Sequence, residues 1–220
     1  MGLKSFVRER FPFIWHTHRA LMFAVHAISG TLTWVSSGYS VPAPTIVKRA
    51  VIKRNALKYG TFVETGTYMG DTTSFARRFS KRVISYEPDN RLFDLAKLRF
   101  KAAPDVTILH ASSDEGLANL TPTLDGAVTF WLDAHYSGEG TYMGQQVSPI
   151  ELELAAIEAH LSAMPSCVVM VDDVRGFGVS PGYPPLVKIV SWAEVNGMAW
   201  HIEHDIFVMR RAAVHTTCRL

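Results

Sequence analysis

Short apolar runs alternate with longer, helix-like segments from residue 61 to residue 195, and this alternation limits the folds open to the chain. The runs that predict buried strands are residues 61–64, 82–87, 106–110, 127–133 and 167–172. The segments that predict helices are residues 45–59, 90–102, 114–120, 149–161 and 185–195. Strands separated by helices are joined by crossovers, so they pair in parallel and are covered on both faces.

The end of the chain departs from this alternation. Residues 199–204 and 206–210 form two β-like runs that are too close together for a crossover, so they must pair as an antiparallel hairpin. The sequence therefore predicts an α/β fold, with a doubly wound, mostly parallel seven-stranded sheet that ends in an antiparallel hairpin.

The first predicted strand leads into a glycine-containing stretch, TFVETGTYMGDTT, at residues 61–73. Glu64 closes the strand, while Gly66 and Gly70 allow a tight turn in which the backbone approaches a ligand without a Cβ in the way. We expect the N-cap of the next helix to come from the three residues after the second glycine: Asp71, Thr72 and Thr73. A plain glycine turn between a strand and a helix would explain the same residues.

Acidic side chains stand at the ends of most predicted strands. Glu87 ends the second strand, Asp133 the fourth, and the pair Asp172 and Asp173 the fifth. Ligands bind open α/β sheets outside the carboxyl ends of the strands, so these acids mark the expected site. Three unpaired carboxylates would repel one another, and a hard divalent cation such as Mg²⁺ or Mn²⁺ relieves that repulsion. Alternatively, Asp173 caps a turn and one aspartate pairs with Arg175.

The order of these motifs resembles that of the class I S-adenosylmethionine (SAM) methyltransferases, which have a Rossmann-like fold. The Glu-x-Gly-x-x-x-Gly turn resembles their motif I, and YEPD around Glu87 resembles their motif II. HASSDEGL, at residues 110–117, resembles the adenine-contacting segment of the catechol O-methyltransferase group, although a helix N-cap would also account for it. FWLDAHY and VVMVDD are similar to motifs of the macrocin O-methyltransferase family, which are metal-dependent sugar O-methyltransferases.

The resemblance covers residues 45–211 and implies a role for each residue that matches a family motif. The implied SAM-binding residues are Glu64, Gly66, Gly70, Thr72, Glu87, Ser112, Ser113 and Asp133. Glu87 would accept hydrogen bonds from the ribose hydroxyls. The implied ligands of Mg²⁺ or Mn²⁺ are Asp133, Asp172 and Asp173.

The resemblance departs from the family pattern at the general base. In the family this base is an aspartate two residues after the first metal ligand, and here His135 stands at that position. A histidine with a pKa near ~6.5 is suited to removing a hydroxyl proton at neutral pH. A loop histidine that merely bonds the adjacent backbone is the alternative. Further candidates for acceptor contact are the glycine-rich residues 137–148, Arg175, Phe177 and Tyr183.

These features predict a SAM- and divalent-metal-dependent O-methyltransferase acting on a hydroxylated small molecule, with a sugar of a natural product or glycan precursor favoured. The alternative from another class is a non-catalytic SAM- or nucleotide-binding module whose N-terminal part docks on a membrane or a partner. An NAD-dependent oxidoreductase is disfavoured because the Gly-x-Gly-x-x-Gly fingerprint is missing.

Residues 1–44 precede the predicted methyltransferase domain, residues 45–220, as a helical extension and linker. Residues 1–60 hold nine Lys and Arg against one acid, whereas residues 61–220 hold thirteen against nineteen. Because the basic residues cluster away from the predicted site, we expect no nucleic acid partner. The chain is 48% apolar and 19% charged, which is typical of a globular protein.

The most apolar window, residues 11–35, is interrupted by histidines and an arginine. Its unbroken apolar part is shorter than the ~20 residues that a bilayer span needs. We expect residues 1–36 to pack on the domain or on a second subunit of a homo-oligomer, with contact to a membrane surface as the alternative. The two cysteines, Cys167 and Cys218, have no metal or redox spacing and fit a cytoplasmic setting.

Overall fold

The computed structural model of the chain describes residues 28–133, 150–180 and 183–211. The chain divides into two compact units, residues 1–48 and 49–220. In the first unit, residues 28–36 are helical. The second unit contains the strands β1 (Thr61–Glu64), β2 (Arg82–Tyr86), β3 (Val106–Leu109), β4 (Ala127–Leu132), β5 (Ser166–Val171), β6 (Met198–Glu203) and β7 (Ile206–Arg211).

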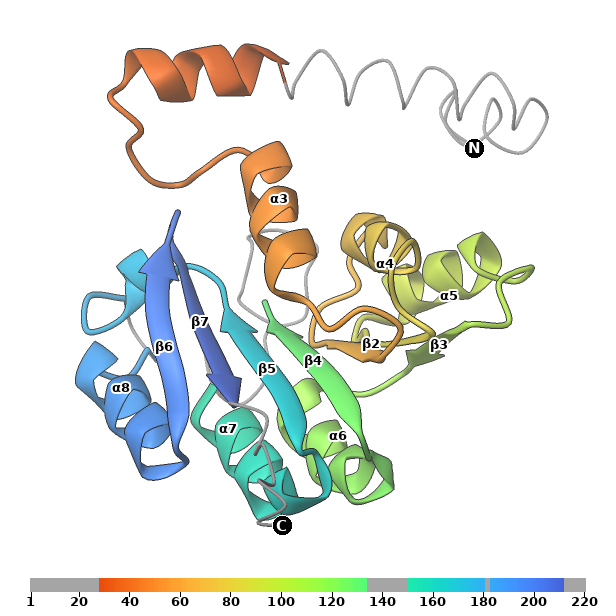
Figure 1. The fold of residues 1–220 in the computed structure, drawn as a ribbon. Helices are drawn as coiled ribbons and strands as arrows, with labels where there is room; N and C mark the ends of the chain where they lie inside the picture. Colours follow the sequence, from red (N-terminus) through yellow and green to blue (C-terminus); the bar gives the residue numbers. More distant parts are fainter. Residues whose placement is uncertain (1–27, 134–149, 181–182, 212–220) are drawn as a thin grey trace, which may run out of the picture. The chain divides into compact units, whose positions relative to one another are not determined.

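These strands form one sheet in the order β3-β2-β1-β4-β5-β7-β6 (Figure 1). The pairs β1–β2, β2–β3, β1–β4 and β4–β5 are parallel. β7 lies between β5 and β6 and is antiparallel to both. The predicted mostly parallel seven-stranded sheet with a C-terminal antiparallel hairpin is therefore confirmed.

Helices cover both faces of the sheet (Figure 1). They are α3 (Thr45–Asn55), α4 (Asp71–Ala76), α5 (Asn90–Arg99), α6 (Ser113–Leu120), α7 (Ile150–Ala159) and α8 (Leu186–Val195). Three short 3₁₀ helices accompany them: η1 (Thr121–Thr123), η2 (Leu161–Ala163) and η3 (Val174–Gly176). None of the helices in the described ranges is both long and apolar enough to cross a membrane.

The alternation of side chains along each central strand produces two apolar layers. On β5, Val169 faces the layer that contains Ile157 of α7, while Met170 faces the layer that contains Ile52 of α3. All four side chains are at most 1% exposed. Complete burial of such a side chain contributes about 1.5–3 kcal/mol to folding, which explains why the apolar runs could be recognised as strands.

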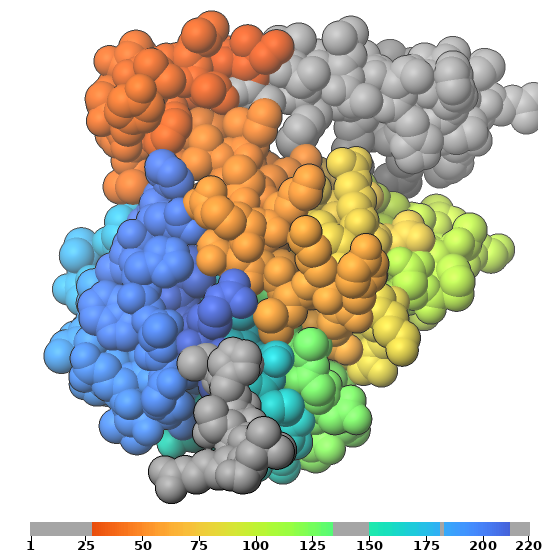
Figure 2. All heavy atoms as spheres, viewed as in Figure 1, coloured from red at the N-terminus to blue at the C-terminus, as the bar shows by residue number. Residues whose placement is uncertain are grey.

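Helix α3 ends at Asn55, earlier than the sequence predicts. The Asn55 side-chain amide donates to the carbonyl oxygen of Val51 (3.0 Å) and to Oε1 of Glu203 on β6 (2.8 Å). Arg54 forms an ion pair with the same glutamate. In Figure 2 the blue atoms of the hairpin border the orange atoms of this part of the chain. The last residue of the helix is therefore in polar contact with a strand that is distant in the sequence.

The predicted N-cap of α4 is wrong. The N-cap is Gly70, which has φ 72° and no side chain to bond the helix. A Cβ at this position would lie 2.7 Å from the ring of Phe100, so only glycine fits without movement. The residues expected to cap lie inside the helix, where Asp71 pairs with Arg99 (2.8 Å) and Thr73 donates to Glu64.

Candidate active site

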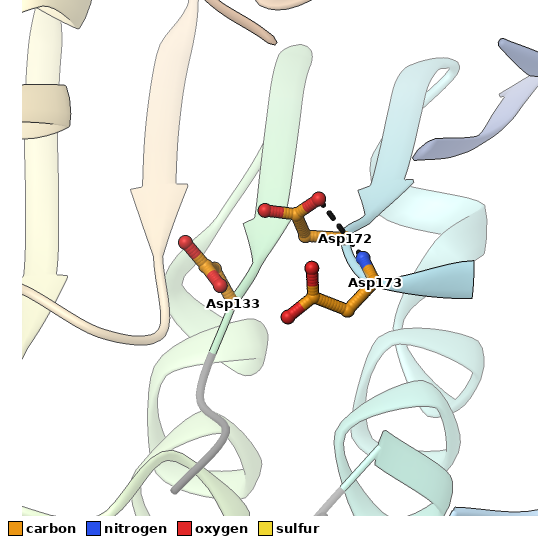
Figure 3. Close-up of side chains that lie close together, drawn as sticks. All are labelled: Asp133, Asp172 and Asp173. Atoms are coloured by element: carbon orange, nitrogen blue, oxygen red, sulfur yellow. Dashed lines mark hydrogen bonds between the residues drawn. The ribbon is translucent and has the colours of Figure 1, made fainter. Parts of the chain in front are cut away.

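The carboxyl ends of β4 and β5 bring three aspartates together. The two strands are parallel, with Leu132 opposite Val171, so the residues that follow, Asp133 and Asp172, are neighbours. Each of Asp133, Asp172 and Asp173 offers one carboxylate oxygen within 4.8 Å of the others. Figure 3 shows the three side chains close together, with those of Asp172 and Asp173 extending toward Asp133. The predicted convergence of these carboxylates is thus observed.

Backbone hydrogen bonds hold the chain at this cluster. The N–H of Asp172 donates to the carbonyl oxygen of Leu132 (3.1 Å), and the N–H of Asp173 donates to Oδ1 of Asp172 (2.9 Å). The N–H of Asp133 donates to Oγ1 of Thr65, just after β1 (3.1 Å). Asp172 and Asp173 are only 5% and 6% exposed, so water screens their charges weakly.

Arg175 lies against the cluster. Its Nη1 donates to Oδ1 of Asp173 (2.7 Å) and also pairs with Asp205, between β6 and β7. The ion pair anticipated as the alternative role of Asp173 therefore exists alongside the convergence of the three aspartates. A carboxylate has two oxygens, so one hydrogen bond from an arginine is compatible with coordination of a cation.

Glu64, at the end of β1, is fully buried. The hydroxyls of Ser85 (2.7 Å) and Thr73 both donate to its Oε2. Burial raises the pKa of Glu64 to about 8, against the lowering effect of these hydroxyls. Glu64 thus connects the end of β1 to β2 and α4 through hydrogen bonds. Its role as a cofactor ligand stays a prediction. Gly66 and Thr72, both partly buried, lie in the turn and in α4 respectively.

Glu87 lies just after β2 and faces the glycine turn. Its carboxylate accepts hydrogen bonds from the N–H of Tyr68 in that turn (2.7 Å) and from the N–H of Asp89 (3.0 Å). Burial raises the pKa of Glu87, and these two hydrogen bonds oppose the rise. The structure therefore joins motif I and motif II through one carboxylate, at the edge of the sheet where the sequence predicts ribose binding.

Ser112 and Ser113 begin α6, but neither hydroxyl caps the helix. Ser112 is the N-cap residue without a side-chain bond, and the Ser113 hydroxyl donates to Oε1 of Glu153 on α7 (2.5 Å). Burial raises the pKa of Glu153 to about 7, and hydrogen bonds from Ser113 and Thr65 oppose the rise.

Glu153 was not recognised as a candidate from the sequence. The available signal was its position on the apolar face of α7, one residue before Leu154 and three after Ile150, where an acid is unusual.

Tyr183 lies near the aspartates. Its ring packs edge to face on Phe177, with 5.2 Å between centroids, and against Gly176, where a Cβ would be 3.3 Å from the ring. Burial raises the pKa of the Tyr183 hydroxyl, and the charges of Asp173, Asp133 and Asp172 add to the rise. His135 and residues 137–148 lie outside the described residues.

No protein-family model matches this sequence, and no curated protein matches it. Solved structures similar to the chain include a Clostridium thermocellum protein described as an rRNA methylase. It is 12% identical, with a TM-score of 0.52, and the match covers 76% of this chain and 96% of that one.

Two further similar structures are methyltransferases by name. The 23S rRNA methyltransferase ErmE is 13% identical, with a TM-score of 0.52, over 79% of this chain and 70% of that one. Precorrin-6y C5,15-methyltransferase from Geobacter metallireducens GS-15 is 18% identical, with a TM-score of 0.50, over 74% and 86%. Identities this low show the fold alone, and they do not support the resemblance to the macrocin O-methyltransferase family. The chain has the fold of the class I SAM-dependent methyltransferases.

Proposed function

We propose that the protein is a SAM-dependent methyltransferase that methylates a hydroxyl of a small molecule, with a divalent cation at Asp133, Asp172 and Asp173. The observation that carries the proposal is the convergence of these three carboxylates at the ends of β4 and β5. In this fold the same edge of the sheet carries the glycine turn and Glu87.

The cofactor would lie across the ends of β1 and β2. Gly70 keeps the turn free of a side chain, and Glu87 is already held by two backbone N–H groups, so its carboxylate is oriented before a ribose arrives. Ser112 and Ser113 would contact the adenine. Because the Ser113 hydroxyl donates to Glu153, the backbone of this segment would supply the contacts to the edge of the base.

The reaction breaks the bond between the methyl carbon and the sulfur of SAM and forms a bond between that carbon and the acceptor oxygen. The acceptor hydroxyl loses its proton, and S-adenosylhomocysteine (SAH) is released. A divalent cation supplies positive charge that lowers the pKa of the acceptor hydroxyl. His135 is the proposed proton acceptor, and Tyr183 is proposed to orient the acceptor.

A sugar is the proposed acceptor because neighbouring hydroxyls suit a cation site made of carboxylate oxygens. Residues 61–220 carry more acidic than basic residues. This negative charge does not favour a nucleic acid acceptor, whose phosphate backbone is also negative. Two of the similar structures are named for rRNA and one for precorrin, so both classes belong in the acceptor screen.

Calorimetric titration of SAM and SAH, with and without Mg²⁺ or Mn²⁺, tests the proposal. We expect SAH to bind, NAD not to bind, and Asp172→Ala to lose Mn²⁺ binding. Asp125→Ala is the matched control because Asp125 is exposed and precedes β4, at the opposite end of the strand from Asp133.

Absence of SAH binding would remove the cofactor assignment. SAH binding that is independent of any cation, with no methyl transfer to sugars, RNA or tetrapyrroles, would favour the non-catalytic binding module.

A further inference from the structure

Asp173 of the carboxylate cluster and both residues of the turn between β6 and β7 have left-handed backbone conformations. The φ angles are 58° for Asp173, 49° for His204 and 71° for Asp205. A residue with a Cβ pays a steric cost in this conformation, and such residues persist where the surrounding structure requires them. Glycine or asparagine would form the two-residue turn between β6 and β7 at lower cost. An aspartate at position 205 therefore calls for an explanation outside the turn.

The explanation lies in the contacts of Asp205. Its Oδ1 accepts the backbone N–H of Arg175 (2.8 Å), and its carbonyl oxygen accepts the N–H of Val174 (3.0 Å). Its Oδ2 pairs with the Arg175 guanidinium, although only 2% of the Asp205 side chain is exposed. One buried carboxylate thus holds both the backbone and the side chain of the residue that contacts Asp173.

Arg175 connects Asp205 to the three-aspartate cluster. Its Nη1 contacts both Oδ2 of Asp205 and Oδ1 of Asp173, the latter at 2.7 Å. β5 ends at Val171, and Asp173, two residues later, has a left-handed backbone conformation. The orientation of the Asp173 carboxylate therefore depends on the residues that contact it beyond the strand. A guanidinium with several donors in one plane is suited to fixing two carboxylates at once.

We infer that Asp205 and Arg175 are positioning residues that hold the carboxylate of Asp173 in the three-aspartate cluster. The inference rests on the proposed cation site. It also assigns an electrostatic role to Asp205. Because its negative charge balances Arg175, Asp173 keeps its own charge for a cation; without Asp205, Arg175 would neutralise Asp173 directly.

The test compares Asp205→Asn and Asp205→Gly with wild type and with the control His204→Asn. Both changes at 205 suit a left-handed residue, so the turn should form. We expect the dissociation constant for Mn²⁺ to rise about tenfold or more in both, as is common when a residue supporting a metal ligand is removed. The dissociation constant for SAH should change little, whereas the unfolding midpoint should fall because Arg175 loses a buried partner. His204→Asn alters the other left-handed position of the same turn and should bind Mn²⁺ like wild type.

Mn²⁺ binding like wild type in a folded Asp205→Asn protein would overturn the inference. If the variants at 205 do not fold, Arg175→Gln takes their place, and its crystal structure must show a displaced Asp173 carboxylate. If wild type itself binds no Mn²⁺, the proposed cation site fails. Crystal structures of wild type and Asp205→Asn then decide the positioning role, because an unmoved Asp173 carboxylate contradicts it and a displaced one supports it.

Discussion

The Ser113 hydroxyl donates a hydrogen bond to Glu153 at 2.5 Å and so joins α6 to the buried face of α7. Thr65 also hydrogen-bonds Glu153, and its Oγ1 accepts the N–H of Asp133. One buried carboxyl group therefore connects the segments that follow β1, β3 and β4, three of the segments in which the sequence predicts site residues.

Glu153 should make stability depend on pH. Its folded pKa of about 7 lies above the ordinary value of 4.5, so between these values the folded protein holds a proton that the unfolded chain releases. Stability therefore falls as pH rises through this window, by at most about 1.4 kcal/mol per pH unit from this group. Glu153→Gln removes the titration. The unfolding midpoint of the variant should therefore rise relative to that of wild type as the pH increases from 5 to 7.

A matched measurement on Glu158→Gln separates this effect from a general change of charge. Glu158 is on the same helix but is exposed, so its substitution makes the same chemical change without altering a buried group. A constant difference between Glu153→Gln and wild type would mean that Glu153 does not titrate there.

Thr65→Val tests the link between Glu153 and Asp133. Valine has nearly the same shape but lacks the hydroxyl, so the N–H of Asp133 and the buried carboxyl each lose a partner. Loss of a partner by a buried polar group costs about 1–3 kcal/mol. We expect urea unfolding to show a loss of this size for Thr65→Val and a smaller one for Thr65→Ser, which keeps the hydroxyl. A loss in Thr65→Ser with none in Thr65→Val would show that packing of the methyl group matters and the hydroxyl does not.

The sequence predicted the strands and the convergence of the aspartates for the same reason. Parallel strands place their carboxyl ends at one edge, so Asp133 and Asp172 had to meet once β4 and β5 were recognised as neighbours. The contacts of Glu153 and Asp205 could not be predicted, because their partners lie 40 and 30 residues away and leave no periodic signal. The prediction of the α4 N-cap was wrong because a glycine in a left-handed conformation begins the helix without a side-chain hydrogen bond.

Glu87→Gln should weaken SAH binding. The amide keeps the size of the side chain but removes the charge and one acceptor oxygen, and hydrogen bonds to charged groups are worth about 1.5–3 kcal/mol. A loss of this size corresponds to a dissociation constant about tenfold to a hundredfold higher, measurable by calorimetry. Glu115→Gln, on the exposed side of α6, is the control. Unchanged affinity in Glu87→Gln would exclude Glu87 as the ribose ligand.

Gly70→Ala should destabilise the protein more than Gly126→Ala. Both glycines have left-handed conformations, with φ 72° and 68°, so an added Cβ incurs a similar backbone cost of about 1–2 kcal/mol at each. At Gly126 the Cβ would meet nothing within 4 Å, whereas at Gly70 it would lie 2.7 Å from Phe100. Relief of that overlap adds about 1–3 kcal/mol and moves the turn that precedes α4. Thermal unfolding should separate the two variants, and SAH affinity should fall only in Gly70→Ala; equal unfolding midpoints would mean that the Phe100 ring yields without cost.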